Sequence, residues 1–311
     1  MTTVFIAILW CCVQNRLDWQ TDTKTALVEM MGFNPDGEEF MSKRNMTFLP
    51  NVVDQCAWDE DRFSQLPRSV QRYFHRAFLF TGEPEQFWED CVKMIRSVTI
   101  TEEGEILMMN GKWVPYVAKR YFSASPLHAG YVWDAKIRYP VALQLPFDID
   151  VYVRDSFSNG QEDKIARMFG AIPFLNSVAR GPAQSARLRW LAYAPVFPTS
   201  LLPHEAVGVH WTRENKKGFW PFQEMIRNEA TADFIDPQGH SSKVNVKFDS
   251  NGLIEHIAAV EENWHFRMSE YKNVGQGILL PSHIESGKQE KNGNFVPHIK
   301  VSIKDVEYTY F

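Results

Sequence analysis

Apolar and polar residues alternate along much of the chain after residue 92. The segment 92–125 alternates around two turn-forming sequences, Glu102-Glu103-Gly104 and Asn110-Gly111. A period of two residues, interrupted by glycine-containing turns, is typical of consecutive antiparallel hairpins. The same alternation continues through 131–139 and 145–155, so we expect further strands there.

A second group of strands is expected between residues 229 and 271. Two turns divide this region, Asp236-Pro237-Gln238-Gly239 and Asp249-Ser250-Asn251-Gly252, and each has a glycine placed for a positive φ. One face of these strands would carry Ala230, Ala232, Phe234, Val244, Val246 and Phe248. The segments 277–286 and 296–311 add two more strands, the second with Val301, Ile303 and Val306 in the apolar pattern.

Helical periodicity is clearest in residues 66–80. Apolar residues at i, i+3, i+4, i+7 and i+8 form one face, namely Val70, Tyr73, Phe74, Ala77 and Phe78. Pro67 lies near the start of this pattern and Gly82 beyond its end, as expected for helix boundaries. Shorter helical patterns cover 22–31 and 162–170.

The apolar run at residues 4–13 has two interpretations. It is too short to span a bilayer, which needs about 20 apolar residues, but its length suits the apolar part of a secretory signal. Its β-branched and aromatic residues equally suit a buried first strand. A signal remnant would make the protein secreted or part of the cell envelope, and a strand would make it cytoplasmic. We therefore treat residues 1–60 as an N-terminal extension and 61–311 as a single β-rich domain.

The segment 187–211 is the most unusual part of the chain. A helix-like apolar run is followed by Pro195, Pro198 and Pro203, and then by a strand-like stretch that ends at Trp211. Prolines end helices and remove backbone donors, so this segment should be irregular and buried. With about ten strands and three or four helices expected in total, the fold class is α+β and mainly antiparallel. We expect an antiparallel and strongly curved sheet, with a few helices and residues 187–203 on its concave face.

Composition excludes several classes of partner. The 311 residues carry a net charge of −5, and basic residues occur in runs no longer than pairs, so the chain offers no support for sustained contact with nucleic acid. No stretch is long enough for an integral membrane span. The four cysteines lack metal-binding or disulfide spacing, which favours buried thiols.

Motifs of known chemistry are missing from the sequence. Phosphate-binding glycine loops, a hydrolase nucleophile elbow, a zinc-protease helix and a kinase loop are all absent. Asp148 and Asp150 share a strand face that we interpret as solvated, and the pairs His204/His210 and His256/His265 lack a third ligand at a recognisable spacing. We therefore predict no metal and no cofactor.

Aromatic residues make up 14% of the chain, and six tryptophans lie in or beside the expected strands: Trp113, Trp133, Trp190, Trp211, Trp220 and Trp264. Most tryptophans belong to a core, but a half-closed sheet lined by aromatic side chains also forms a pocket for an apolar ligand.

Several short blocks resemble a family of uncharacterised proteins, DUF6544 (DUF6920-like), over residues 66–311. The blocks are LPRSVQRYF, YFSASPLHAGYVWDA, DVYVRDSFSNG, RLRWLAYAPVFPTSLLP, VHW and GILLPSHIE. By this resemblance the recurrent family positions are Trp133, Asp155, Arg189, Pro198, Leu202, Trp211 and Pro281. More loosely, the chain resembles the half-barrel of lipoprotein carriers such as LolA and LolB, which implies a fold and not a function.

The sequence also departs from the family pattern. Tyr193 stands where the family usually has a glutamate, Gly160-Gln161-Glu162 replaces a Gly-x-Gly, and Ser286-Gly287 replaces a recurrent tryptophan. If that glutamate is catalytic in relatives, this chain lacks it.

Two functions remain open. The first is binding of a small apolar or amphiphilic molecule by Trp133, Trp190, Phe197 and Trp211, with Arg189 facing an acidic head group. The second is a cofactor-independent enzyme acting on an aromatic or lipid-derived molecule in the same cavity. Its acid–base candidates are Asp155, Arg189, Tyr193 and Glu262. A structural alternative also stands, in which Asp155 and Arg189 form a buried ion pair that holds the Pro-rich segment.

Overall fold

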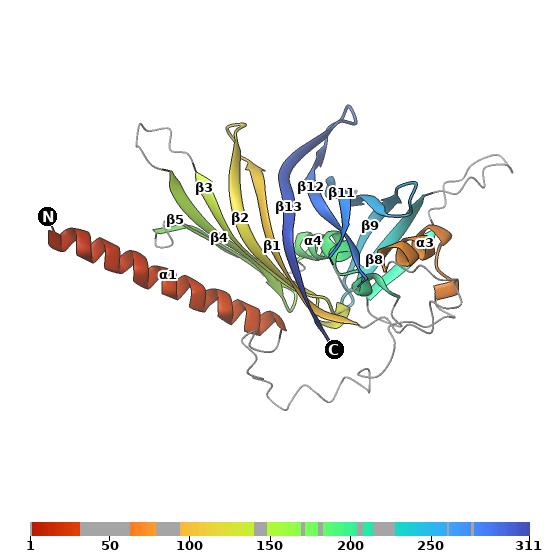
Figure 1. Cartoon of the computed structure of the whole chain (residues 1–311), viewed down its shortest axis with the longest axis horizontal. Coiled ribbons are helices and arrows are strands. Elements are labelled where there is room, and N and C mark those ends of the chain that lie inside the picture. Colours follow the sequence, from red (N-terminus) through yellow and green to blue (C-terminus); the bar gives the residue numbers. More distant parts are fainter. Residues whose placement is uncertain are drawn as a thin grey trace.

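The computed structural model describes residues 2–31, 63–78, 94–139, 148–168, 172–179, 183–203, 208–213, 228–259, 261–274 and 277–311. Within these residues the chain forms one open sheet of thirteen strands, in the order β6-β5-β4-β3-β2-β1-β13-β12-β11-β10-β9-β8-β7. Every neighbouring pair is antiparallel. The sheet curves strongly and stays open, which confirms the expected half-barrel (Figure 1).

The first half of the sheet is formed by β1 (Ile95–Leu107), β2 (Trp113–Ser123), β3 (Gly130–Tyr139), β4 (Ile149–Ser158), β5 (Gln161–Met168) and β6 (Ile172–Ala179). The second half is formed by β7 (Gly208–Arg213), β8 (Glu229–Ile235), β9 (Ser241–Phe248), β10 (Ile254–Ala259), β11 (Trp264–Asn273), β12 (Leu279–Gln289) and β13 (Phe295–Tyr310). The two halves join where β13 pairs with β1.

This topology explains the Pro-rich segment. Strands β6 and β7 are consecutive in the chain but lie at opposite edges of the sheet, so their connection must cross the whole sheet. The connection contains α4 (Gln184–Tyr193) and the short 3₁₀ helices η5 (Ala194–Val196) and η6 (Pro198–Leu201). Helix α4 contacts both β3 and β9, and Figure 1 shows it inside the curve of the sheet. The segment thus lies on the concave face, as predicted.

The core fills the space between the concave face and two helices. Helix α3 (Arg68–Ala77) buries the predicted face, and the predicted residues of β8 and β9 are buried as well. Residues 190–202 are all buried, so the connection is part of the core and not a surface loop. The turns at Asp236–Gly239 and Asp249–Gly252 form as expected, with φ values of 82° at Gly239 and 88° at Gly252.

Helix α1 (Thr2–Met31) lies on the other side of the sheet. It contacts β2, β3 and β4, and Figure 1 shows it against their outer face. Its inner face is buried at Trp19, Thr23, Leu27 and Met30, a helical spacing. The indole of Trp19 donates a hydrogen bond to Asp134 of β3 at 3.0 Å. The strand interpretation of residues 4–13 is therefore wrong, because those residues are helical; the signal interpretation stays a prediction.

Two further sequence predictions are wrong. The proposed turn at Glu102–Gly104 does not form, because β1 continues through it. Gly104 is required there by close packing: a Cβ atom would lie 2.0 Å from the carbonyl oxygen of Lys300. The proposed helix at 162–170 is also wrong, because its described residues, 162–168, belong to strand β5. Asn159 and Gly160, with φ of 49° and 75°, form a tight turn that folds β5 back onto β4.

Candidate functional site

A cavity of about 360 Å³ lies between α4 and the concave face of the sheet. Its apolar wall consists of Trp133, Leu188, Tyr193, Trp264, Phe266 and Ile299. Its polar wall consists of Arg120, Asp155, Lys164, Ser185, Arg189 and Ser286. The strands on both sides of the β1/β13 junction contribute to it, so the cavity exists only because the two halves of the sheet curve towards each other.

A buried ion pair forms one side of the cavity. Glu102 is fully buried and accepts hydrogen bonds from Arg120, at 3.1 Å from Nε and 2.9 Å from Nη2. Trp133 Nε1 and the Tyr116 hydroxyl also donate to it, at 2.8 and 3.3 Å. The guanidinium carbon of Arg120 lies 4.2 Å from the centre of the Tyr193 ring. Both charges are thus satisfied by hydrogen bonds and a cation–π contact, the condition under which a buried pair is tolerated.

A second cluster of charges surrounds Arg189. Its guanidinium donates to Asp155 and, at 2.6 Å, to Glu162. Lys164 Nζ lies 2.7 Å from the same Glu162 oxygen, and the Tyr131 hydroxyl donates to Asp155 at 3.3 Å. The cluster contains two basic and two acidic side chains, so it is neutral when all four are ionised. Lys164 is its most exposed cation, with 38% of its side chain accessible compared with 25% for Arg189.

The two carboxyl groups of this cluster differ in acidity. Burial raises the pKa of Asp155 above its usual range, although Arg189 and Lys164 act in the opposite direction. Burial also acts to raise the pKa of Glu162, but hydrogen bonds and positive charge from Lys164 and Arg189 outweigh it, and the pKa is lowered overall. Of the two carboxyl groups in this cluster, Asp155 therefore holds a proton more readily.

The structure brings four of the predicted site residues together: Trp133, Asp155, Arg189 and Tyr193 all line the cavity. The others lie elsewhere. Trp190 is fully buried, packs on Phe234 with ring centres 4.8 Å apart, and donates to the Ser123 carbonyl.

The three remaining predicted site residues also lie outside the cavity wall. Phe197 is fully buried against Phe122, with ring centres 4.9 Å apart. Trp211 donates to the carbonyl of Leu201 at 2.8 Å. Glu262 accepts a hydrogen bond from Gln184 outside the cavity wall.

Sequence reasoning missed Glu102, Arg120, Glu162 and Lys164. One signal was present, because Arg120 occupies the same face of β2 as the buried Val114, Tyr116, Ala118 and Phe122. A charged residue in an apolar face requires a buried partner of opposite charge. Glu102 was not recognised as this partner, because the sequence pattern placed it in a turn.

The candidate metal-binding residues are not grouped into a site in the described part of the chain. Among the residues that the structure describes, no group of three or more His, Cys, Asp or Glu side chains is arranged to hold a metal ion. Asp150 pairs with Lys136 at 2.7 Å, and His256 and His265 bond to each other. His204 lies outside the described residues.

No helix in the described part of the chain is long and apolar enough to cross a membrane.

Comparisons with known proteins give a family and distant structural similarities. Residues 57–300 match the model of DUF6544, a family of unknown function. Among curated proteins, none matches this sequence. The chain is similar to a DUF1329 family protein from Desulfovibrio piger, with 10% identity, a TM-score of 0.39, and coverage of 77% of this chain and 91% of that one. A putative outer membrane lipoprotein-sorting protein domain from Vibrio parahaemolyticus gives 10% identity, a TM-score of 0.37, and coverage of 79% and 93%.

Proposed function

The chain belongs to the DUF6544 family, whose function is unknown, and we propose that it binds a small apolar or amphiphilic molecule in the concave cavity. The observation that carries this proposal is a cavity of about 360 Å³ whose wall contains six apolar or aromatic side chains. Ligand pockets typically have volumes of about 300–1,000 Å³ and a mainly apolar lining with few polar groups.

The paired charges determine which ligand fits. Arg120 and Arg189 already bond to carboxylates, so neither is free to hold an acidic head group without breaking an ion pair. Lys164 also pairs with Glu162, at 2.7 Å, but its side chain is more exposed than that of Arg189, so it is the cation best placed to meet such a head group. The apolar part of the ligand would cover Trp133, Trp264 and Phe266, with about 25 cal/mol gained per Å² of apolar surface removed from water.

The test is binding of lauric acid and of decanol, measured by calorimetry and by tryptophan fluorescence. Ser286→Phe places a ring inside the cavity and should weaken binding of both probes at least tenfold. Ser302→Phe is the matched control, because Ser302 lies on the neighbouring strand β13 outside the cavity wall, and it should bind like the wild type. Absence of binding to the wild type, or equal binding by both variants, would contradict the proposal.

One observation favours the enzyme alternative. Asp155 combines a raised pKa with a place in the cavity wall, a combination found in acid–base catalysts. Mass spectrometry of a ligand recovered after incubation separates the two functions. A carrier returns the ligand unchanged, whereas an enzyme returns a product, and Asp155→Asn should then stop product formation while the ligand still binds.

A further inference from the structure

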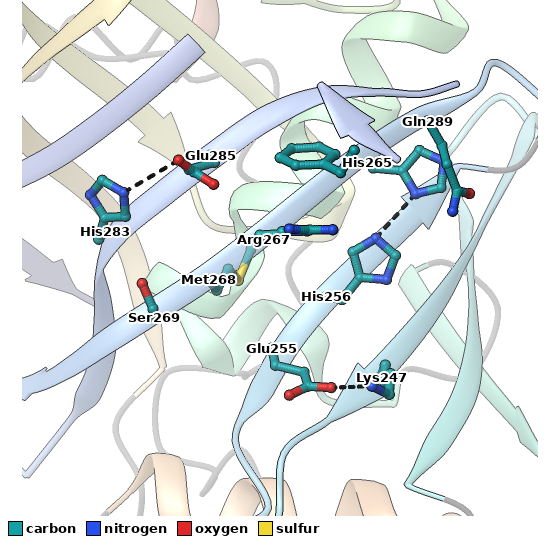
Figure 2. A pocket seen from close by; sticks show the side chains of 11 residues that line it. Lys247, Glu255, His256, His265, Arg267, Met268, Ser269, His283, Glu285 and Gln289 are labelled. Carbon is teal, nitrogen blue, oxygen red and sulfur yellow. Dashed lines mark hydrogen bonds and ion pairs between the residues drawn. The ribbon is translucent and has the colours of Figure 1, made fainter. Parts of the chain in front are cut away.

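The outer face of the second half of the sheet carries a groove of about 470 Å³ that is separate from the cavity. It crosses β9, β10, β11 and β12 (Figure 2), and Phe295 of β13 also lines it. Its lining is mostly polar and charged and includes three histidines, so a purely apolar ligand has no reason to bind there.

Strand register places basic residues next to one another in this groove. Lys247 of β9 is the direct partner of His256 of β10, and His256 is the direct partner of Arg267 of β11. Directly opposite residues in an antiparallel pair have Cβ atoms about 4.5–5.5 Å apart, and like charges at that distance destabilise the sheet. When His256 is protonated, these three adjacent basic positions repel one another unless a negative group compensates them.

The protein supplies only part of that compensation. Glu255 pairs with Lys247 at 2.5 Å. Arg267 has Glu285 of β12 directly opposite, yet in the described structure no carboxylate oxygen lies within ion-pair distance of its guanidinium. The guanidinium carbon instead lies 4.2 Å from the centre of the Phe295 ring, and Figure 2 shows the side chain extended towards the histidines and away from Glu285.

The two histidines are held in a defined hydrogen-bonded chain. The ring planes of His256 and His265 differ by 12°, with centres 5.2 Å apart and a 3.1 Å contact between His256 Nε2 and His265 Nδ1, so the rings meet edge to edge. Asn263 Oδ1 lies 3.3 Å from His265 Nε2 and also accepts from the backbone N–H of Gln289. His265 Nε2 must then donate, His265 Nδ1 must accept from His256, and the His256 Nδ1 atom is left unprotonated.

The surrounding charges agree with this assignment. Burial lowers the pKa of His256 to about 4, with further lowering by His265, Arg267 and Lys247 and only Glu255 acting against it. His283 and Glu285 of β12, 4.0 Å apart, complete the titratable groups that line the groove. The field at His256 is thus positive, and it attracts an anion.

We propose that the groove binds a small oxyanion, a phosphate, sulfate or carboxylate group, over the row formed by Lys247, His256 and Arg267. Arg267 supplies a free fork of N–H donors that matches two oxygens of such an anion. A bound anion favours protonation of His256 at Nδ1, and at low pH this atom becomes a second charged donor. Anion binding is then coupled to protonation of the histidine pair, and it strengthens as the pH falls.

The proposal is tested by titrating inorganic phosphate against chloride at constant ionic strength while the imidazole signals are followed by NMR. Phosphate should raise the pKa of His256, and a rise of one unit means about tenfold tighter binding to the protonated pair. Arg267→Gln should weaken phosphate binding at least tenfold, and Arg267→Lys should retain part of it. Lys272→Gln, at an exposed position of the same strand outside the groove, should bind phosphate like the wild type.

A phosphate group can come from solution or from a lipid, and a second arm separates these sources. Vesicles of phosphatidylglycerol are sedimented with the wild type and with Arg267→Gln. Cosedimentation that the variant loses identifies a lipid head group, whereas phosphate binding without cosedimentation identifies a soluble anion. An unchanged His256 pKa at saturating phosphate, or equal phosphate affinity in wild type and Arg267→Gln, overturns the proposal. The groove and the cavity lie on opposite faces, so neither result depends on what the cavity binds.

Discussion

The concave cavity and the outer groove both contain arginines, but they satisfy them differently. In the cavity, Arg120 and Arg189 each bond to a carboxylate, and the Arg120 pair is almost fully buried. In the groove, Arg267 bonds to no carboxylate in the described structure and stacks on an aromatic ring beside two histidines. The charges of the cavity are therefore paired with one another, whereas Arg267 in the groove has no carboxylate partner among the described residues.

This difference indicates what each charge does. A buried ion pair whose hydrogen bonds are complete fixes the positions of the side chains around it, and removal of one partner leaves the other charged in a low dielectric. A row of basic residues at the surface fixes no neighbouring side chains and costs stability once His256 is protonated, so its presence points to a ligand. The variants below separate the two cases, because they predict stability changes of opposite sign.

The largest effect is expected for Glu102→Gln. The substitution removes the negative charge opposite Arg120, whose guanidinium stays buried, and we expect a loss of about 3–5 kcal/mol in the free energy of unfolding. Because the cavity wall includes Arg120, ligand binding should fall with it. Urea unfolding followed by tryptophan fluorescence measures the change.

The neighbouring glutamate is a matched control. Glu103 is exposed, lies on the opposite face of β1, and pairs with Lys304 at 3.2 Å. Glu103→Gln should change stability by less than about 0.5 kcal/mol. Similar effects of the two substitutions would show that the Glu102–Arg120 pair does not support the cavity.

An intermediate effect that depends on pH is expected for the second cluster. Because the pKa of Asp155 is raised on folding, the wild type loses stability relative to Asp155→Asn as the pH rises from about 4 through the raised value. Each unit of that rise is equivalent to about 1.4 kcal/mol. Thermal melts across this pH range measure the difference.

Glu162→Gln should behave in the opposite way. The pKa of Glu162 is lowered on folding, so the ionised side chain stabilises the folded state at pH values above its ordinary pKa of about 4.3. This stabilisation is lost as the pH falls through the lowered pKa. The stability of the wild type relative to this variant should therefore increase with pH. Parallel pH profiles for the two variants would rule out the assigned difference in acidity.

The sequence predicted the fold class because period-two alternation and glycine turns are local signals. The turns at Gly239 and Gly252 and the buried face of α3 followed from such signals alone. The predicted helix at 162–170 failed because helical propensity was outweighed by pairing with β4 and β6 on both sides. A local Asn-Gly signal at 159–160 was present and was not used.

The sites were less predictable, because they depend on which strands become neighbours. Trp133 and Arg189 were assigned to the cavity from their context, but Trp190, one residue away on the same helix as Arg189, faces the core. Strand order places Glu102 beside Arg120 and Lys247 beside His256. No pattern within a single segment contains that information, since register is a property of two strands at once.

The smallest effect is expected for Arg267→Gln, and it should be stabilising. Below about pH 4, where His256 is protonated, removal of the Arg267 charge relieves repulsion with this directly opposite residue, for which about 0.2–1 kcal/mol is typical. The gain should disappear in 1 M salt, where charges are screened over about 3 Å, and also in saturating phosphate, which stabilises only the wild type. Lys272→Gln serves as the control, because it removes the same charge from the same strand outside the row and should leave stability unchanged. Urea unfolding at low and high salt gives the comparison, and a destabilised Arg267→Gln would mean that this arginine supports the fold in the same way as Arg120 does.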